Sequence, residues 1–249
     1  MIFFESAEFL DAAPAFIQTQ IPRHQFRLGW RGEDFDACLS VTESETYLVY
    51  VGQPHSLEYA RIIAQATTSG FAPTLVSIPT DLAEELHLEK RRDFYYLIRT
   101  HPFPPQRVVK GASVVAPGEC DSEIDKFLAL HGPDSAVRPG NPELDFWIVI
   151  RDELGHIVAV SAGVTWQSGE KVINSVAVDK NARRRGFGSL VTILAGQQHF
   201  ANHAQRVGLG VRASNRGALA LYRKIGFNEE LAMSAIRIAE QSESQSSAH

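Results

Sequence analysis

The chain has 249 residues, 44% of them hydrophobic, and a formal net charge of −5. This composition excludes disorder over most of the chain, and the length fits one large domain or two domains of roughly 100–150 residues. No stretch approaches the roughly 18 consecutive apolar residues of a membrane-spanning helix, and the N-terminus lacks the basic start of a secretory signal. We therefore expect a cytoplasmic protein with no membrane partner.

The first hundred residues alternate between helix and strand patterns. Helical spacing occurs over residues 6–18, 56–68 and about 80–88, and β-branched and aromatic runs predict strands at 46–51, 73–78 and 93–99. Three prolines within residues 101–105 then predict an extended connector, because proline lacks a backbone N–H and restricts the residue before it. We expect this connector to end an N-terminal α/β domain of residues 1–104.

A second pattern starts at residue 107. Strands are expected at 108–115, 145–150, 156–166 and 171–178, with a helix at 120–131, and the short turns between the later strands indicate an antiparallel meander. Period 3.6 then predicts helices from 187 to about 204 and over 215–224, with a strand at 206–211 between them and strand-like residues up to 238. Residues 240–249 are polar and low in complexity, so we expect a disordered tail.

The segment from Val176 to Leu190 carries the chemistry. An apolar strand ends there, a loop with three arginines and two glycines follows, and a helix begins. The free N–H groups and positive dipole of a helix N-terminus attract an anion, and glycines let it approach the backbone. Residues 180–224 hold nine basic residues and no acidic one. The pattern fits a pyrophosphate, and the alternative is a tight strand–helix turn with solvated arginines.

Two motifs together resemble the GCN5-related N-acetyltransferase (GNAT) family. One is Arg/Gln-x-x-Gly-x-Gly/Ala, matched by Arg183-Arg184-Arg185-Gly186-Phe187-Gly188. The other is Asn-x-x-Ala-x-x-x-Tyr-x-x-x-Gly-Phe, matched by Asn215, Ala218, Tyr222, Gly226 and Phe227. The resemblance covers about Val108 to Ile238. It implies a mixed-sheet α/β fold of GNAT type for residues 107–239, preceded by a degenerate GNAT-like domain or another α/β domain.

The resemblance also implies acetyl-CoA as cosubstrate. Backbone amides of the loop Arg183–Gly188, which we call the glycine loop, would hold the pyrophosphate. The strand ending at Val178 would pair with the pantetheine arm in a gap beside the next strand. Asn215 would hydrogen-bond the cofactor, and Tyr222 would protonate the leaving thiolate, or else pack in the core. The implied cofactor residues are Val176, Ala177, Val178, Arg183, Arg184, Arg185, Gly186, Phe187, Gly188, Ser189, Asn215, Ala218 and Tyr222.

The general base is open. Family members often place a Glu or His on the strand before the loop, but here the corresponding positions hold Val172, Asn174 and Asp179. Asp179 is a candidate base, and its alternative role is a turn carboxylate paired with Arg183 or Arg184. Glu170 reads as a solvated charge, and a water chain is also compatible with the family.

Other polar and aromatic residues carry weaker signals. His101, His131 and His156 have no evident link to one another. His199 and His203 are four residues apart on one helix but lack a third ligand, so we expect a polar helix face and no metal. Trp30, Trp147 and Trp166 are expected in the core. Cys38 and Cys120 are expected as free thiols, with a disulfide between them as the alternative.

These observations predict an N-acetyltransferase that moves the acetyl group of acetyl-CoA to a primary amine by direct attack. No cysteine or serine occupies a nucleophile setting. The alternatives are a non-catalytic acyl-CoA-binding module and a transferase of a larger acyl group. The placement of the arginines around Gly186 favours a compact phosphate ligand over nucleic acid. The expected partners are acetyl-CoA and an unidentified amine, with a homodimer as a further possibility.

Overall fold

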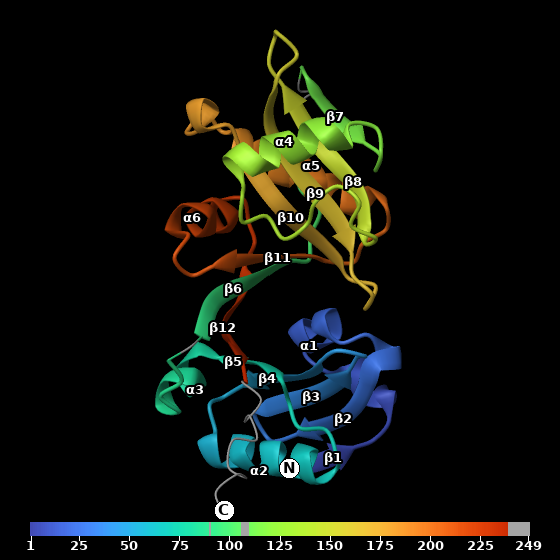
Figure 1. The fold of residues 1–249 in the computed structure, drawn as a ribbon, viewed down its shortest axis with the longest axis vertical. Coiled ribbons are helices and arrows are strands. Elements are labelled where there is room, and N and C mark those ends of the chain that lie inside the picture. Colours follow the sequence, from blue (N-terminus) through green and yellow to red (C-terminus); the bar gives the residue numbers. More distant parts are fainter. Residues whose placement is uncertain (90, 106–109, 239–249) are drawn as a thin grey trace, which may run out of the picture. The chain divides into compact units, whose positions relative to one another are not determined.

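The computed structural model describes residues 1–89, 91–105 and 110–238, and it forms two compact units (Figure 1). Unit 1 comprises Met1–Phe94 and the segment from Ala232 onward, and unit 2 comprises Tyr95–Leu231. The chain therefore enters unit 2 within strand β6 (Arg91–Arg99) and leaves it within strand β12 (Glu229–Arg237). The tail expected at 240–249 lies outside the described residues. No helix in the described ranges has the length and apolar content needed to cross a membrane.

Unit 1 is a mixed sheet with helices. Its strands follow the order β1-β2-β3-β4-β5-β12, antiparallel except for the parallel pair β4–β5. Its elements are β1 (Ile2–Phe4), η1 (Ala7–Ala12), α1 (Ala15–Gln20), η2 (Arg23–Gln25), β2 (Phe26–Arg31), β3 (Phe35–Val41), β4 (Thr46–Gly52), α2 (Ser56–Thr68), β5 (Leu75–Pro79) and α3 (Thr80–Glu85).

Two features of unit 1 differ from the sequence pattern. The helix expected over 6–18 is divided into the 3₁₀ turn η1 and the helix α1, because Pro14 at the N-cap of α1 cannot continue a helix from the residues before it. Strands β2 and β3 were not predicted as separate elements. Trp30 and Tyr50 are fully buried among the core side chains between these strands and α2.

Unit 2 is a second mixed sheet, with the order β6-β11-β10-β9-β8-β7. The predicted antiparallel meander is confirmed in β8–β9–β10, and β11 runs parallel to β10. Its elements are β7 (Ala112–Val115), α4 (Asp121–His131), β8 (Leu144–Arg151), β9 (Ile157–Thr165), β10 (Lys171–Val178), η3 (Lys180–Ala182), α5 (Phe187–Ala201), β11 (Val207–Arg212) and α6 (Arg216–Lys224). Part of the strand expected at 108–115 falls on residues outside the description.

Helices cover the two faces of the β8–β10 sheet (Figure 1). On one face, Ile124 of α4 packs in a buried cluster with Trp147 and Ala177. On the other face, Val191 of α5 packs in a second cluster with Ile173. Ile173 and Ala177 are four residues apart and would share a face of a regular strand, and they face opposite helices because the register of β10 shifts between them.

The two units repeat one order of elements. Each has a strand, helical segments, three antiparallel strands, a helix, a parallel strand and a last helix. The sequence shows no convincing repeat, so this correspondence becomes visible only in the fold. In each unit, one edge strand of the sheet comes from the other half of the chain. This strand is β12 in unit 1 and β6 in unit 2.

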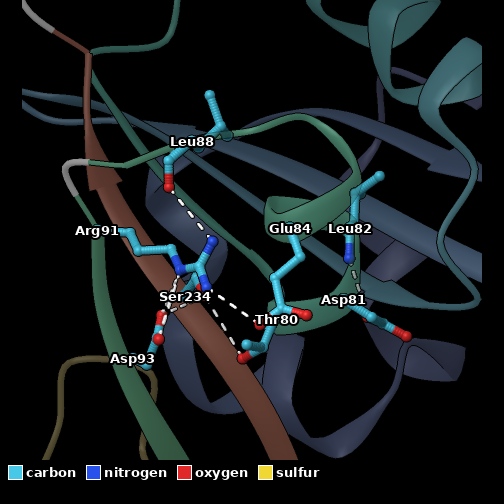
Figure 2. Close-up of polar contacts among 8 residues, drawn as sticks. All are labelled: Thr80, Asp81, Leu82, Glu84, Leu88, Arg91, Asp93 and Ser234. Carbon is cyan, nitrogen blue, oxygen red and sulfur yellow. Dashed lines mark hydrogen bonds and ion pairs between the residues drawn. The ribbon is translucent and has the colours of Figure 1, made fainter.

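A polar cluster holds β12 in unit 1 (Figure 2). Asp93 on β6 accepts a 2.6 Å hydrogen bond from the fully buried Ser234 of β12 and a 3.1 Å bond from Arg91. Arg91 also donates to Glu84 on α3 at 3.1 Å and to the carbonyl of Leu88 at 3.3 Å. The cluster therefore ties α3, β6 and β12 together within unit 1.

Candidate functional site

Strand β10 bends at a β-bulge. Its register with β9 shifts between Asn174 and Ala177, and Ser175 has a φ of 49°. The buried Ser175 hydroxyl donates to the carbonyl of Val137 at 2.7 Å and accepts from its N–H at 3.1 Å. Because a bulge bends its strand and disrupts the ladder locally, this anchored bulge sets the path of the second half of β10, which pairs with β9 again from Ala177.

Beyond the bulge, β10 is unpaired on its β11 side. The two strands are in register at Val172 and Gly208, with no further pairing within their described residues. The N–H of Asp179 donates to Val158 of β9, and peptide groups alternate direction along a strand. The backbone groups of Val176 and Val178 therefore point toward β11. We call residues 173–178 of β10 the unpaired stretch; it matches the predicted gap beside Val178.

The glycine loop carries the chain from this stretch to α5. Gly186 is the N-cap of α5 with a φ of 88°, which glycine adopts without strain, and it supplies no side-chain cap. The first intrahelical bond is from Leu190 to Gly186. The N–H groups of Phe187, Gly188 and Ser189 thus have no acceptor within the helix. These free donors lie at the helix start where the sequence predicts anion binding.

Gly188 lies where α5, α6 and β10 meet. A β-carbon at Gly188 would lie 3.0 Å from Leu221 Cδ1 and 3.6 Å from Val178 Cγ2. The second glycine of the motif therefore permits a close approach of the three elements. This contact brings the loop beside both the unpaired stretch and the helix that carries Tyr222.

The three loop arginines are exposed and make no ion pair with any residue in the described ranges. Arg183 Nε lies 3.5 Å from the carbonyl oxygen of Val178, and the Arg185 guanidinium lies 5.9 Å from the ring centre of Phe187. Arg184 has a φ of 66°. Three uncompensated cations beside a helix N-terminus favour a bound anion.

Helix α6 brings the second motif to the same place. Asn215 is its N-cap, and its side-chain oxygen accepts the N–H of Ala218 at 3.1 Å. That oxygen is therefore engaged by the helix, whereas the amide N–H₂ stays available as a donor. Tyr222 is 7% exposed and packs with Val178 and Phe227 in one hydrophobic cluster.

The hydroxyl of Tyr222 makes no hydrogen bond within the part of the chain that the structure describes. Burial raises the pKa of Tyr222 to about 12, because a phenolate would lose its hydration there. Tyr222 therefore keeps its proton at neutral pH. Its packing and its free hydroxyl are compatible with both roles considered from the sequence, core residue and proton donor.

Asp179 lies at the end of β10 and contacts α4. One carboxylate oxygen accepts the N–H of Asn181 at 2.7 Å, and the other lies 3.9 Å from Nε2 of His131. Within the described ranges Asp179 forms no ion pair with Arg183 or Arg184, the pairing weighed against a base role. His131, the last residue of α4, was not linked to this site by any sequence spacing. Only the packing of α4 on β10 reveals the contact.

The other candidate residues either lie away from the glycine loop and Tyr222 or make contacts that stabilise the fold. Glu170 forms a partly buried ion pair with Arg206, with Nε to Oε2 at 2.9 Å, so the expected solvated charge is wrong. His199 is fully buried and contacts the carbonyl of Val172 at 3.2 Å, so the expected polar helix face is wrong for this residue. No group of three metal-binding side chains occurs among the described residues.

The remaining predictions on aromatic residues and thiols have clear outcomes. Trp30 and Trp147 are fully buried as expected, whereas Trp166 is half-buried and stacks on Tyr96 at 6.4 Å. Cys38 and Cys120 are free thiols, as expected. A cavity of about 190 Å³ in unit 1 shares none of the predicted site residues; it is lined by Pro14, Arg31, Gly32, Glu33, Asp34, Phe35, Asp36, Val51 and Gly52.

Comparisons with known proteins agree with this geometry. Residues 119–227 match the sequence model of the acetyltransferase (GNAT) family. The match contains the unpaired stretch, the glycine loop and α6. A comparison with curated proteins gives no match.

Solved structures share the fold over both units. A GCN5-related N-acetyltransferase from Sphaerobacter thermophilus is 18% identical with a TM-score of 0.54, over 83% of this chain and 78% of that one. One from Kribbella flavida is 18% identical with a TM-score of 0.54, over 92% and 94%. A GNAT-family acetyltransferase from Colwellia psychrerythraea is 12% identical with a TM-score of 0.53, over 92% and 93%. The mixed α/β fold expected from the sequence is thereby confirmed.

Proposed function

We propose that this protein, whose residues 119–227 match the acetyltransferase (GNAT) family, transfers the acetyl group of acetyl-CoA to a primary amine. The observation that carries the proposal is the unpaired stretch of β10, which leads directly into an uncapped helix N-terminus. A pantetheine arm needs backbone partners and a pyrophosphate needs N–H donors. Both sets of groups occur here within one continuous segment.

The residues proposed to bind the cofactor contact different parts of it. The N–H groups at the start of α5, with the exposed side chains of Arg183, Arg184 and Arg185, would hold the pyrophosphate. The backbone of Val176 and Val178 would pair with the pantetheine arm, and the N–H of Val178 would polarise the thioester carbonyl. The free amide N–H₂ of Asn215 would donate to the cofactor. Acetyl-CoA supplies an activated acyl group, and no metal is required.

Acid and base are proposed on opposite faces of the sheet. Val176, Val178 and Tyr222 belong to the cluster on the α5 face. Ala177 belongs to the cluster on the α4 face, and Asp179, two residues on, contacts His131 of α4. Asp179 would take a proton from the ammonium on the α4 face. Tyr222 would donate a hydrogen bond, and then its proton, to the leaving sulfur on the α5 face.

We propose that unit 1 binds no acyl-CoA and instead contributes to acceptor selection or to a homodimer. Its parallel strands β4 and β5 pair at three positions, which leaves a shorter part of β4 without a β5 partner, residues 50–52, than the unpaired stretch of β10. It is then a degenerate GNAT-like domain, of which 1–104 are the sequence-predicted bounds. The free thiols Cys38 and Cys120 are compatible with the proposed cytoplasmic location.

Calorimetric titration of the full chain with acetyl-CoA tests the proposal, followed by amine-dependent thiol release with spermidine, L-lysine, ethanolamine and a lysine-containing peptide. Micromolar binding of acetyl-CoA and amine-dependent release of CoA would support it. Absence of binding to acetyl-CoA would contradict it, and binding of a longer acyl-CoA alone would favour the transferase of a larger acyl group. Binding without thiol release would favour the non-catalytic module.

A further inference from the structure

We propose that His131 is a positioning residue for Asp179, the base assigned above; the inference rests on the proposed function. His131 ends α4, and Asp179 follows the last residue of β10. The side chains are 15% and 27% exposed, so both are largely shielded yet reachable from solvent. The pair lies on the α4 face, where the amine is proposed to arrive.

The hydrogen bonds around His131 define its tautomer. The backbone N–H of Lys180 donates to Nδ1 of His131 at 3.2 Å. A backbone N–H can only donate, so Nδ1 presents its lone pair and the neutral ring carries its proton on Nε2. Nε2 is the atom that faces Oδ2 of Asp179, at 3.9 Å. The ring therefore presents an N–H to the carboxylate and has no lone pair left to act as a base itself.

The carboxylate of Asp179 is oriented from both sides. Oδ1 accepts the N–H of Asn181, which makes Asp179 the N-cap of η3. Oδ2 is left to face His131. The separation of 3.9 Å exceeds a hydrogen bond, so the contact is electrostatic here; catalytic hydrogen bonds are commonly long before substrate binds. The ring of His131 is itself held by Phe127, with ring centres 4.6 Å apart.

The segment after α4 also reaches both strand ends beside the unpaired stretch. His131 contacts the end of β10, and Asp134 forms a 3.3 Å ion pair with Arg212 at the end of β11. Gly132 packs closely on β10, since a β-carbon there would lie 3.0 Å from that of Ala177. The charged residues that these adjoining segments contribute are Lys180 and Arg183 of the loop and the Asp134–Arg212 ion pair.

In the balanced reaction, Asp179 accepts one proton and releases one proton in each turnover. Asp179 takes a proton from the ammonium, and the amine nitrogen then attacks the thioester carbon. The C–N bond forms as the C–S bond breaks. The proton that Tyr222 gives to the sulfur is replaced by the second proton lost from the nitrogen, and the proton on Asp179 passes to solvent. His131 keeps its own proton throughout and holds Oδ2 toward the amine.

The test compares His131→Ala with His131→Gln, using the fastest amine from the thiol-release panel. Glutamine can accept from Lys180 and donate to Asp179, so we expect His131→Gln to keep at least a third of kcat. His131→Ala should lower kcat roughly 10- to 100-fold, leave KM for acetyl-CoA within about twofold, and move the acid limb of the kcat profile to higher pH. Combined with Asp179→Asn, His131→Ala should cost less than about twofold more.

A matched control is His156, whose Nδ1 lies 3.6 Å from Asp152 at an exposed turn. His156→Ala should leave kcat unchanged. Equal losses in the alanine and glutamine variants at position 131, additive losses with Asp179→Asn, or a raised KM for acetyl-CoA would overturn the inference. If the unmodified chain binds no acetyl-CoA, the proposed function itself fails. If it binds acetyl-CoA but acetylates none of the four amines, the catalytic roles of Asp179 and His131 are overturned while the cofactor site stands.

Discussion

The two units share an order of elements but differ at one strand pair. In unit 1, β4 and β5 pair at Tyr47 with Leu75, Leu48 with Val76 and Val49 with Ser77. In unit 2, the equivalent strands β10 and β11 pair only at Val172 with Gly208. The ladder on the other side differs as well, since β10 has the bulge at Ser175 in its pairing with β9, whereas the register of β3 with β4 has no shift. Under the proposed function, the interrupted strand pair of unit 2 is the feature that would admit a pantetheine arm, and the shared order of elements would not be sufficient.

The segments that follow β4 in unit 1 and β10 in unit 2 also differ. After β4, the chain reaches α2 through a short turn that ends at the N-cap position His55, whereas after β10 a longer loop carries to α5 three arginines that have no ion pair in the described ranges. The last helices differ in charge as well. Helix α3 contains three acidic residues and no basic one, whereas α6 contains three basic residues and no acidic one. Unit 2 alone therefore combines free backbone groups with positive charge.

The strongest test of this difference is a pair of tyrosines. Tyr222 in unit 2 and Tyr59 in unit 1 are both buried, and burial raises the pKa of each to about 12. Neither hydroxyl has a hydrogen-bond partner in the described parts of the chain. Tyr222→Phe should lower kcat about 100- to 10,000-fold and change acetyl-CoA affinity less than about threefold, because only proton donation is lost.

Tyr59→Phe should leave acetyl transfer unchanged. Thiol release and calorimetry on both variants provide the measurement. Equal activity of Tyr222→Phe and the unmodified chain would show that Tyr222 is only a core residue.

Reversing charge in the loop should have the next largest effect. Arg184→Glu combined with Arg185→Glu should weaken acetyl-CoA binding about 10- to 100-fold, because charge-assisted contacts to a phosphate are replaced by repulsion. Both side chains are exposed, so the fold should be retained. Lys126→Glu, an exposed change of the same sign on α4, is the control. Calorimetry should show full affinity in the control, and equal affinities in both variants would remove the loop from the site.

His199 should make unit 2 sensitive to acid. Burial lowers the pKa of His199 from its ordinary value of 6.5 to about 4. Between these values the unfolded chain binds the proton more readily than the folded chain, so stability should fall as the pH drops from 6.5 to 4, by up to roughly 3 kcal/mol. Chemical denaturation across this range measures the loss. His199→Gln should flatten the slope, whereas changing the exposed His203 to Gln should leave it as it is.

The polar cluster of unit 1 should matter for stability but not for cofactor binding. Asp93→Ala removes the partner of both Ser234 and Arg91, which should cost about 1–3 kcal/mol of unfolding free energy. Acetyl-CoA affinity should stay within about twofold. Denaturation and calorimetry separate the two quantities, and a large loss of affinity would contradict the assignment of the cofactor to unit 2 alone.

Structural features were predictable from the sequence where they depend on residues that are close together along the chain. The helix from Phe187, the helix expected over 215–224 and the meander of β8–β10 follow from periodicity and short turns, and all are present. The break at Pro14 was equally local but was missed. In contrast, the His131–Asp179 contact joins residues distant in sequence through packing of α4 on β10. The buried state of His199 likewise depends on the sheet beneath α5. Such contacts have no spacing signal.

Hydrogen exchange with and without acetyl-CoA tests the central difference between the units most directly. We expect new protection at the amides of residues 184–189 and at Val176 and Val178, with none at the turn between β4 and α2. Those amides have no acceptor in the helix or face the unpaired side of β10, so a bound cofactor should protect them. Protection at residues 52–56 of unit 1, or no change in residues 176–189, would contradict the assignment of the cofactor site to unit 2.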